Sequence, residues 1–187
     1  MVGFAKANTR IGFAQVERNH MSGGEAEGRI HAQLPADTTV MGTVLENGRF
    51  AKYDYANGKV TTTGDLEWEM IYNEEMLYDE RLQNHKDFAL QAKNYVNGEL
   101  VPRLMAVEVG DIFTTNAIGE DTLTAAQISA ITEFTEAGAT MPTVGTNLYI
   151  AANGYLSTTE AEGPVFQVVK VYNLADTQPA VKVMRIK

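Results

Sequence analysis

Residues 53–63 read YDYANGKVTTT and residues 149–159 read YIAANGYLSTT, so one short phrase occurs twice in this 187-residue chain. With Asn57 aligned to Asn153, the leading tyrosine, the Asn-Gly pair and the last two threonines are identical. Each copy predicts a strand, an Asn-Gly turn and a returning Thr-rich strand. A two-residue type I′ turn needs positive φ at both central residues, which asparagine and glycine tolerate best. The repeat therefore predicts one β-hairpin design used in two related halves of the fold.

Strand signals continue on both sides of the two hairpins. Residues 38–72 read as a meander, and residues 100–118 and 147–187 contain further β-rich runs. Residues 65–70 alternate, which predicts a strand with Trp68 and its neighbours Leu66 and Met70 on a buried face and Glu67 on a solvated one. We expect a mainly β fold, with one or two small β-barrels built from related hairpins.

Two short helices are expected between the hairpin copies. Residues 79–93 carry a candidate N-cap at Asp79 and an apolar face. Residues 122–138 contain a candidate N-cap at Thr124, with Gln127 three residues later to complete a capping box, and end at Gly138.

The first 34 residues differ from the rest in charge and pattern. Residues 1–34 hold five glycines, four basic and three acidic residues, and no sustained apolar period. We interpret residues 1–34 as an extended N-terminal arm and residues 35–187 as a β-rich body. The arm would order against a partner through a few apolar and basic side chains, with a disordered leader as the alternative. The candidate partner-binding residues are Phe4, Lys6, Arg10, Ile11, Phe13 and Arg18.

Composition excludes several classes of function. The formal net charge of −9 argues against a nucleic-acid binder, and the absence of cysteine excludes disulfides and thiolate metal sites. The chain has no apolar run long enough to cross a membrane, and the segment MVGFAKANTR lacks the continuous apolar core of a secretory signal.

Candidate catalytic and metal-binding residues are few. Asp65, Glu67 and Glu69 could bind Ca²⁺ or act as a glycosidase pair, but carboxylates two apart on a strand lie about 7 Å from one another. A solvated strand face is the favoured interpretation. The three histidines are widely separated, and no serine lies in a G-x-S-x-G context. We expect no catalytic residue, no metal, no cofactor and no enzymatic activity.

Aromatic residues offer one further interpretation. Trp68 and the tyrosines Tyr53, Tyr55, Tyr72 and Tyr78 could form a sugar-stacking platform. We favour the alternative, in which they fill a barrel core or a subunit contact.

A longer run around the second hairpin carries a family resemblance. Residues 144–159 read VGTNLYIAANGYLSTT, and Gly163-Pro164 leads into VFQVV at 165–169. This run resembles the small β-barrel module of tailed-phage capsid decoration proteins, which commonly show VGD-x-(V/L)Y, a glycine, (V/L)TTT and PVG-x-(V/A). Residues 109–113, VGDIF, resemble the start of the same phrase. Gln167 stands where that run often has glycine, and the two expected helices separate the copies.

The resemblance implies a non-enzymatic virion protein, made in the host cytoplasm, that binds the outer surface of a phage head and stabilises capsomer contacts. Its implied partners are the major capsid protein and neighbouring decoration subunits, which would allow a homo-oligomer on the capsid, with no nucleic acid and no membrane. Two alternatives stay open: a head-fibre base, tail-tube or adaptor protein of the virion, and a carbohydrate-binding surface module.

Overall fold

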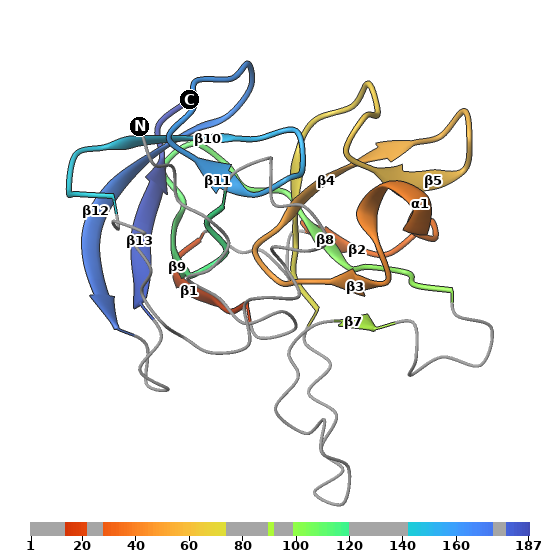
Figure 1. Ribbon diagram of the computed structural model, residues 1–187, viewed down its shortest axis with the longest axis horizontal. Helices are drawn as coiled ribbons and strands as arrows, with labels where there is room; N and C mark the ends of the chain where they lie inside the picture. The colour runs from red at the N-terminus through yellow and green to blue at the C-terminus, as the bar shows by residue number, and fades with distance from the viewer. Residues whose placement is uncertain (1–13, 22–27, 74–89, 92–98, 120–141, 174–178) are drawn as a thin grey trace, which may run out of the picture.

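The computed structural model describes residues 14–21, 28–73, 90–91, 99–119, 142–173 and 179–187. The prediction of a mainly β fold is confirmed: these residues form a five-stranded and a six-stranded antiparallel sheet with one short helix. Figure 1 shows the two sheets side by side, with strands of residues 30–105 in one lobe and the strands of residues 16–20 and 112–185 in the other. Both sheets are open in strand order, and no closed barrel is formed among the described strands.

The C-terminal lobe is the six-stranded sheet, ordered β1-β9-β13-β12-β10-β11. Its strands are β1 (Val16–His20), β9 (Ile112–Thr115), β13 (Pro179–Arg185), β12 (Val165–Asn173), β10 (Asn147–Ile150) and β11 (Leu156–Ser157). The sheet is curled, as shown by a parallel bridge between Ile118, just after β9, and Leu156 of β11. The Gly119 N–H donates to the Leu156 carbonyl at 3.0 Å, so the two ends of the sheet nearly meet.

The N-terminal lobe is the five-stranded sheet, ordered β2-β8-β6-β4-β5. Its strands are β2 (Ile30–His31), β8 (Leu104–Met105), β6 (Glu69–Ile71), β4 (Phe50–Asp54) and β5 (Lys59–Thr61). It curls in the same way: Ala36 bridges Val60, and the Asp37 N–H donates to the Val60 carbonyl at 2.8 Å. Beside it, β3 (Val44–Leu45) pairs with β7 (Leu90–Gln91).

The two lobes repeat one strand order. Without β1, the order β9-β13-β12-β10-β11 matches β2-β8-β6-β4-β5 position by position. Single hydrogen bonds also recur: Gly48 N–H donates to the Ile71 carbonyl at 2.9 Å, and Gly145 N–H donates to the Val168 carbonyl at 2.8 Å. The prediction of two related halves is therefore confirmed, and it extends to five strands in each half.

The two Asn-Gly turns occupy equivalent places but are longer than predicted. The first loop spans residues 55–58, between the paired Asp54 and Lys59, and the second spans residues 152–154, between Ala151 and Tyr155. Both glycines have positive φ, 64° at Gly58 and 85° at Gly154. The expected two-residue turn is wrong because side chains stabilise wider loops. In the first loop, the Asp54 carboxylate accepts the N–H of Asn57 at 3.0 Å.

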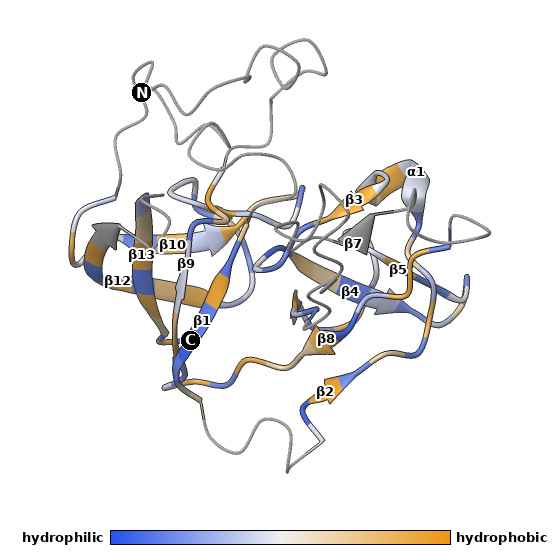
Figure 2. Ribbon diagram, turned by 90° about the horizontal axis from the view of Figure 1, so that it is seen from below, coloured by the Kyte–Doolittle hydropathy of each residue, from blue (hydrophilic) through white to orange (hydrophobic). Residues whose placement is uncertain are grey.

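A shared core joins the lobes. Phe50 of the N-terminal lobe lies 5.3 Å from Phe166 of the C-terminal lobe, and Phe113 packs edge-on against Phe166 at 5.7 Å. All three rings are fully buried. Figure 2 shows apolar and polar residues alternating along β12 and β13, as expected for strands with one face toward this core.

Three local expectations are corrected. Residues 65–68 are not strand: β6 begins at Glu69, and Leu66 is 46% exposed, whereas Trp68 packs against the core and Glu67 is exposed as predicted. Residues 38–41, expected in a strand, form the helix α1 (Thr38–Met41), because the Asp37 carboxylate caps the Thr39 N–H at 3.0 Å. The helix expected over 79–93 does not include Leu90–Gln91, which are strand β7. The rest of that helix, and the one at 122–138 within residues 120–141, lie outside the described residues.

The expected arm contains two strands of the body. β1 pairs with β9, and β2 pairs with β8, so residues 16–20 and 30–31 of the 1–34 segment are ordered within the chain's own sheets. Arg29 is buried and forms an ion pair with Asp111 of the C-terminal lobe. Residues 1–13 and 22–27 lie outside the described residues, so an arm that orders on a partner stays a prediction for residues 1–13.

Candidate functional site

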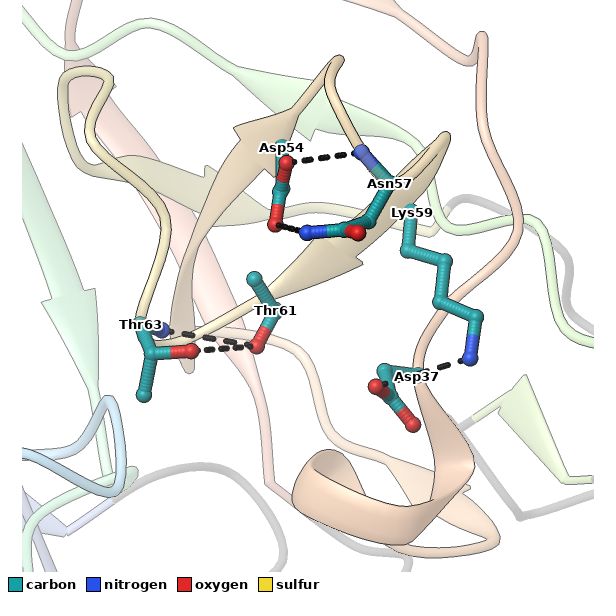
Figure 3. Close-up of a pocket in the computed structure, with 6 residues that line it drawn as sticks. All are labelled: Asp37, Asp54, Asn57, Lys59, Thr61 and Thr63. Carbon is teal, nitrogen blue, oxygen red and sulfur yellow. Dashed lines mark hydrogen bonds and ion pairs between the residues drawn. The ribbon is translucent and has the colours of Figure 1, made fainter.

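A polar hollow of about 310 Å³ opens beside the first Asn-Gly hairpin. We call it the hairpin hollow; its lining residues come from the segment before α1, from β4, from the 55–58 loop and from β5 and its end. They are Asp37, Asp54, Asn57, Lys59, Thr61 and Thr63. Figure 3 shows these side chains around the open space, with Asp54 turned toward Asn57 and Lys59 turned toward Asp37.

The hollow holds two ionised carboxylates. Hydrogen bonds from the Thr39 hydroxyl and N–H lower the pKa of Asp37, and Lys59 Nζ, 3.5 Å away, acts in the same direction. Hydrogen bonds from the side chain and backbone of Asn57 lower the pKa of Asp54. Both carboxylates are therefore charged at neutral pH and are already held by neighbours. This arrangement suits the binding of polar groups rather than proton transfer.

Three stacked rings come from His31 on β2, Tyr53 on β4 and Tyr55 in the 55–58 loop. His31 stacks on Tyr53 at 5.2 Å, and Tyr53 stacks on Tyr55 at 5.5 Å. Tyr53 is buried, and burial raises the pKa of its hydroxyl, whereas Tyr55 is 58% exposed and its hydroxyl donates to Gln33 Oε1 at 2.7 Å. The two tyrosines therefore differ: Tyr53 is a core residue, as the favoured interpretation expects, and Tyr55 presents a ring to solvent.

Sequence reasoning missed an ionisable pair beneath this stack. Glu69 Oε2 lies 3.3 Å from His31 Nε2, and both side chains are mostly buried. Burial raises the pKa of Glu69, and the nearby His31 partly opposes that rise. This contact lacks hydrogen-bond geometry, because Glu69 Oε2 has no hydrogen-bond partner among the described residues. A regular strand alternation had placed Glu69 in solvent, so no sequence signal indicated this pair.

A second polar cluster lies where the lobes meet. The Tyr155 hydroxyl donates to Glu46 Oε2 at 2.9 Å, and the Arg49 guanidinium lies 5.4 Å from the Tyr155 ring. Arg49 also donates from Nε to the Asn153 carbonyl at 2.7 Å. Burial, followed by the Glu46 carboxylate, raises the pKa of Tyr155 well above its usual value. The cluster is closed by its own contacts, so we assign it to holding the lobes together.

The predicted arm residues are divided between described and undescribed segments. Arg18 lies on β1, exposed, with its guanidinium 4.9 Å from the centre of the Tyr72 ring. The remaining candidates lie outside the described residues: Phe4, Lys6, Arg10, Ile11 and Phe13. The structure therefore does not bring the six residues together as one described site.

Within the described ranges, no group of three or more His, Asp or Glu side chains is placed to hold a metal ion, and this includes the Ca²⁺ candidate at Asp65, Glu67 and Glu69. None of the helices in the described segments is both long and apolar enough to cross a membrane.

Comparison with known proteins adds no assignment. No family model matches the chain, and neither a curated protein nor a solved structure is significantly similar to it.

Proposed function

We propose that this chain is a non-enzymatic structural protein of a virion, which binds the outer surface of a phage head and stabilises the contacts between capsomers. The observation that carries the proposal is the run at residues 144–169 together with its place in the fold. That run supplies the entry turn, β10, the hairpin, β11 and the start of β12, and these form one side of the six-stranded sheet. The same elements recur in the other lobe.

The physical properties of the described chain suit this role. A head under pressure from packaged DNA gains strength from rigid proteins that bridge its subunits. Here a buried aromatic cluster and buried ion pair join two lobes into one body. Many copies on a lattice bind with high avidity even when each contact is weak. Such a protein needs a broad polar surface and exposed turns, and it needs no catalytic group.

Co-sedimentation with assembled heads that lack this chain tests the proposal. A decoration protein pellets with the heads, saturates at a fixed copy number and raises the temperature at which the heads release DNA. A variant lacking residues 1–13 tests the arm and leaves β1 and β2 intact. If the chain pellets with isolated tails and not with heads, the fibre, tube or adaptor alternative holds. If it pellets with neither, the virion proposal fails.

A carbohydrate-binding module is the second candidate, and the hairpin hollow favours it. The hollow gathers carboxylates, an amide and hydroxyls, and the same hairpin carries the exposed ring of Tyr55; sugar sites combine such groups. A glycan array followed by titration of a hit tests it. Binding must be lost in Asp54→Ala and Tyr55→Ala and retained in Val109→Arg, which lies in a separate turn.

A further inference from the structure

The contact between the two lobes uses two different surfaces. The N-terminal lobe contributes the entry turn at residues 46–50, and the C-terminal lobe contributes its hairpin apex at residues 153–155. The Phe50 N–H donates to the Gly154 carbonyl at 2.6 Å, and the packing is so close that a methyl group on Gly154 would overlap the Phe50 carbonyl. Because both lobes share one fold, this head-to-tail contact leaves one entry turn and one hairpin apex unused.

The unused entry turn is at residues 143–147 of the C-terminal lobe. It matches residues 46–50, because Thr146 N–H donates to the Thr143 carbonyl at 3.0 Å as Arg49 N–H does to Glu46 at 3.4 Å. A Cβ on Gly48 would lie 2.6 Å from Thr115 Oγ1, whereas Gly145 has no described atom within 4 Å of that position. Val144 beside it is 65% exposed. The turn that is buried in one lobe is therefore open in the other.

The unused hairpin apex is at residues 57–59 of the N-terminal lobe. Gly58 is equivalent to Gly154, and it too has no described atom within 4 Å of its Cβ position. Lys59, equivalent to Tyr155, is 46% exposed at the side chain. The bridging residues Ala36 and Ile118 are equivalent in the two lobes, so Gln33 and Thr115, each three residues earlier, are equivalent too. Thr115 contacts the buried turn, whereas Gln33 is exposed.

We propose that copies of this chain associate head to tail, with residues 143–147 of one copy docked on residues 57–59 and Gln33 of the next. The contact repeats the geometry that already joins the two lobes inside each chain. Such an association closes into a ring if the rotation per copy permits, and otherwise extends as a filament. The proposal stands on the equivalence of the lobes and does not depend on the capsid.

The side chains at the open surfaces indicate how such a contact differs from the internal one. The strand pairings show which residues are equivalent. Asn147 pairs with Gln167 as Phe50 pairs with Met70, so Asn147 is equivalent to Phe50. Leu148 pairs with Phe166 as Ala51 pairs with Glu69, so Glu69 is equivalent to Phe166. The internal contact between Phe50 and Phe166 therefore becomes Asn147 against Glu69, an amide against a carboxylate. The Glu69 carboxylate is mostly buried, and its Oε2 lies 3.3 Å from His31 Nε2.

A second internal pair also changes. The hydrogen bond between Tyr155 and the Glu46 carboxylate corresponds to Thr143 against Lys59. Polar groups replace the buried rings at the open surfaces, so the association is reversible and weaker than the lobe contact.

Analytical ultracentrifugation of the full chain tests this assignment at physiological ionic strength, where salt screens the net charge of −9. Val144→Arg blocks the open turn and Gln33→Arg blocks the open apex. Both residues are exposed, so both variants should fold. Val109→Arg is the matched control. Val109 is also 65% exposed and also precedes a positive-φ glycine. Strand register places Ile112 and Asn147 in one row of the sheet, and because β9 runs antiparallel to β10, the turns that precede them leave that row in opposite directions.

The expected result is concentration-dependent association of the wild type and of Val109→Arg, weakened at least tenfold in each blocked variant. An equal mixture of the two blocked variants should give dimers and nothing larger, because each retains one working surface. Wild-type chains that stay monomeric up to millimolar concentration would overturn the proposal. So would loss in only one blocked variant, or a mixture that forms no dimer, since either result indicates a contact between like surfaces.

A gain-of-association variant gives an independent measure. Thr143→Glu combined with Lys59→Tyr places the internal hydroxyl–carboxylate pair across the contact between copies. This double variant should associate at least several-fold more tightly than the wild type. An unchanged or weaker association of a folded double variant would contradict the proposed register.

Discussion

Replacing Gly154 by alanine should destabilise the chain far more than replacing Gly58. Both glycines have positive φ, so alanine costs about 1 kcal/mol of left-handed strain at either position. At Gly58 the added methyl group enters open space. At Gly154 it overlaps the Phe50 carbonyl oxygen, so the hairpin must withdraw and the 2.6 Å hydrogen bond from the Phe50 N–H is lost. A buried donor left without its partner costs about 1–3 kcal/mol more.

Urea denaturation of the two variants and the wild type measures this difference in the free energy of unfolding. The measurement is made at dilute protein, so that association between copies does not contribute. We expect a loss of about 1 kcal/mol for Gly58→Ala and about 2–4 kcal/mol for Gly154→Ala. Equal losses in the two variants would refute the close docking of the second hairpin on β4. A larger loss at Gly58 would refute it as well.

Three other perturbations test separate contacts. Asp111→Ala should cost about 3 kcal/mol in chemical denaturation, because it leaves the Arg29 guanidinium buried without its carboxylate, and a loss below about 1 kcal/mol would contradict that pairing. Trp68→Ala should cost about 2 kcal/mol, less than for a fully enclosed ring, because Trp68 is partly exposed beneath Lys52; near-wild-type melting would exclude a packing role. The pKa of Tyr155 is raised in the fold, so its contribution to the free energy of unfolding is present below the ordinary tyrosine pKa and is lost as pH rises above about 10. Tyr155→Phe should flatten this alkaline loss of stability. An unchanged dependence of stability on pH would argue against burial of the hydroxyl.

The duplication could be read from the sequence because its signal is local. Asn-Gly and the threonines that follow it specify a turn and a returning strand within a few residues. The extent of the duplication could not be read, since β2 and β9, or β8 and β13, share strand order but little sequence. The alignment of Tyr53 with Tyr149 in the sequence does not hold in the structure. The second loop is one residue shorter, so buried Tyr53 corresponds to Ile150 rather than to Tyr149.

The candidate site was less accessible to sequence reasoning, because its contacts join residues far apart in the chain. The His31–Glu69 pair forms only because β2 and β6 flank β8. The alternation at 65–70 had predicted a solvated Glu69. The strand begins only at Glu69, so residues 65–68 belong to no sheet and their alternation does not indicate which way the Glu69 side chain points. Likewise, residues 38–41 were expected in a strand by their β propensity, whereas capping of the Thr39 N–H by Asp37 favours a helical turn.

Cryo-electron microscopy of assembled heads mixed with the purified chain tests the central claim most directly. The proposed function predicts density on the outer surface at fixed lattice positions, into which the two five-stranded units of one chain fit as a rigid pair. Residues 1–13 should become traceable against the capsid or a neighbouring copy. Heads whose outer surface stays bare at saturating concentrations of folded chain would contradict the proposal.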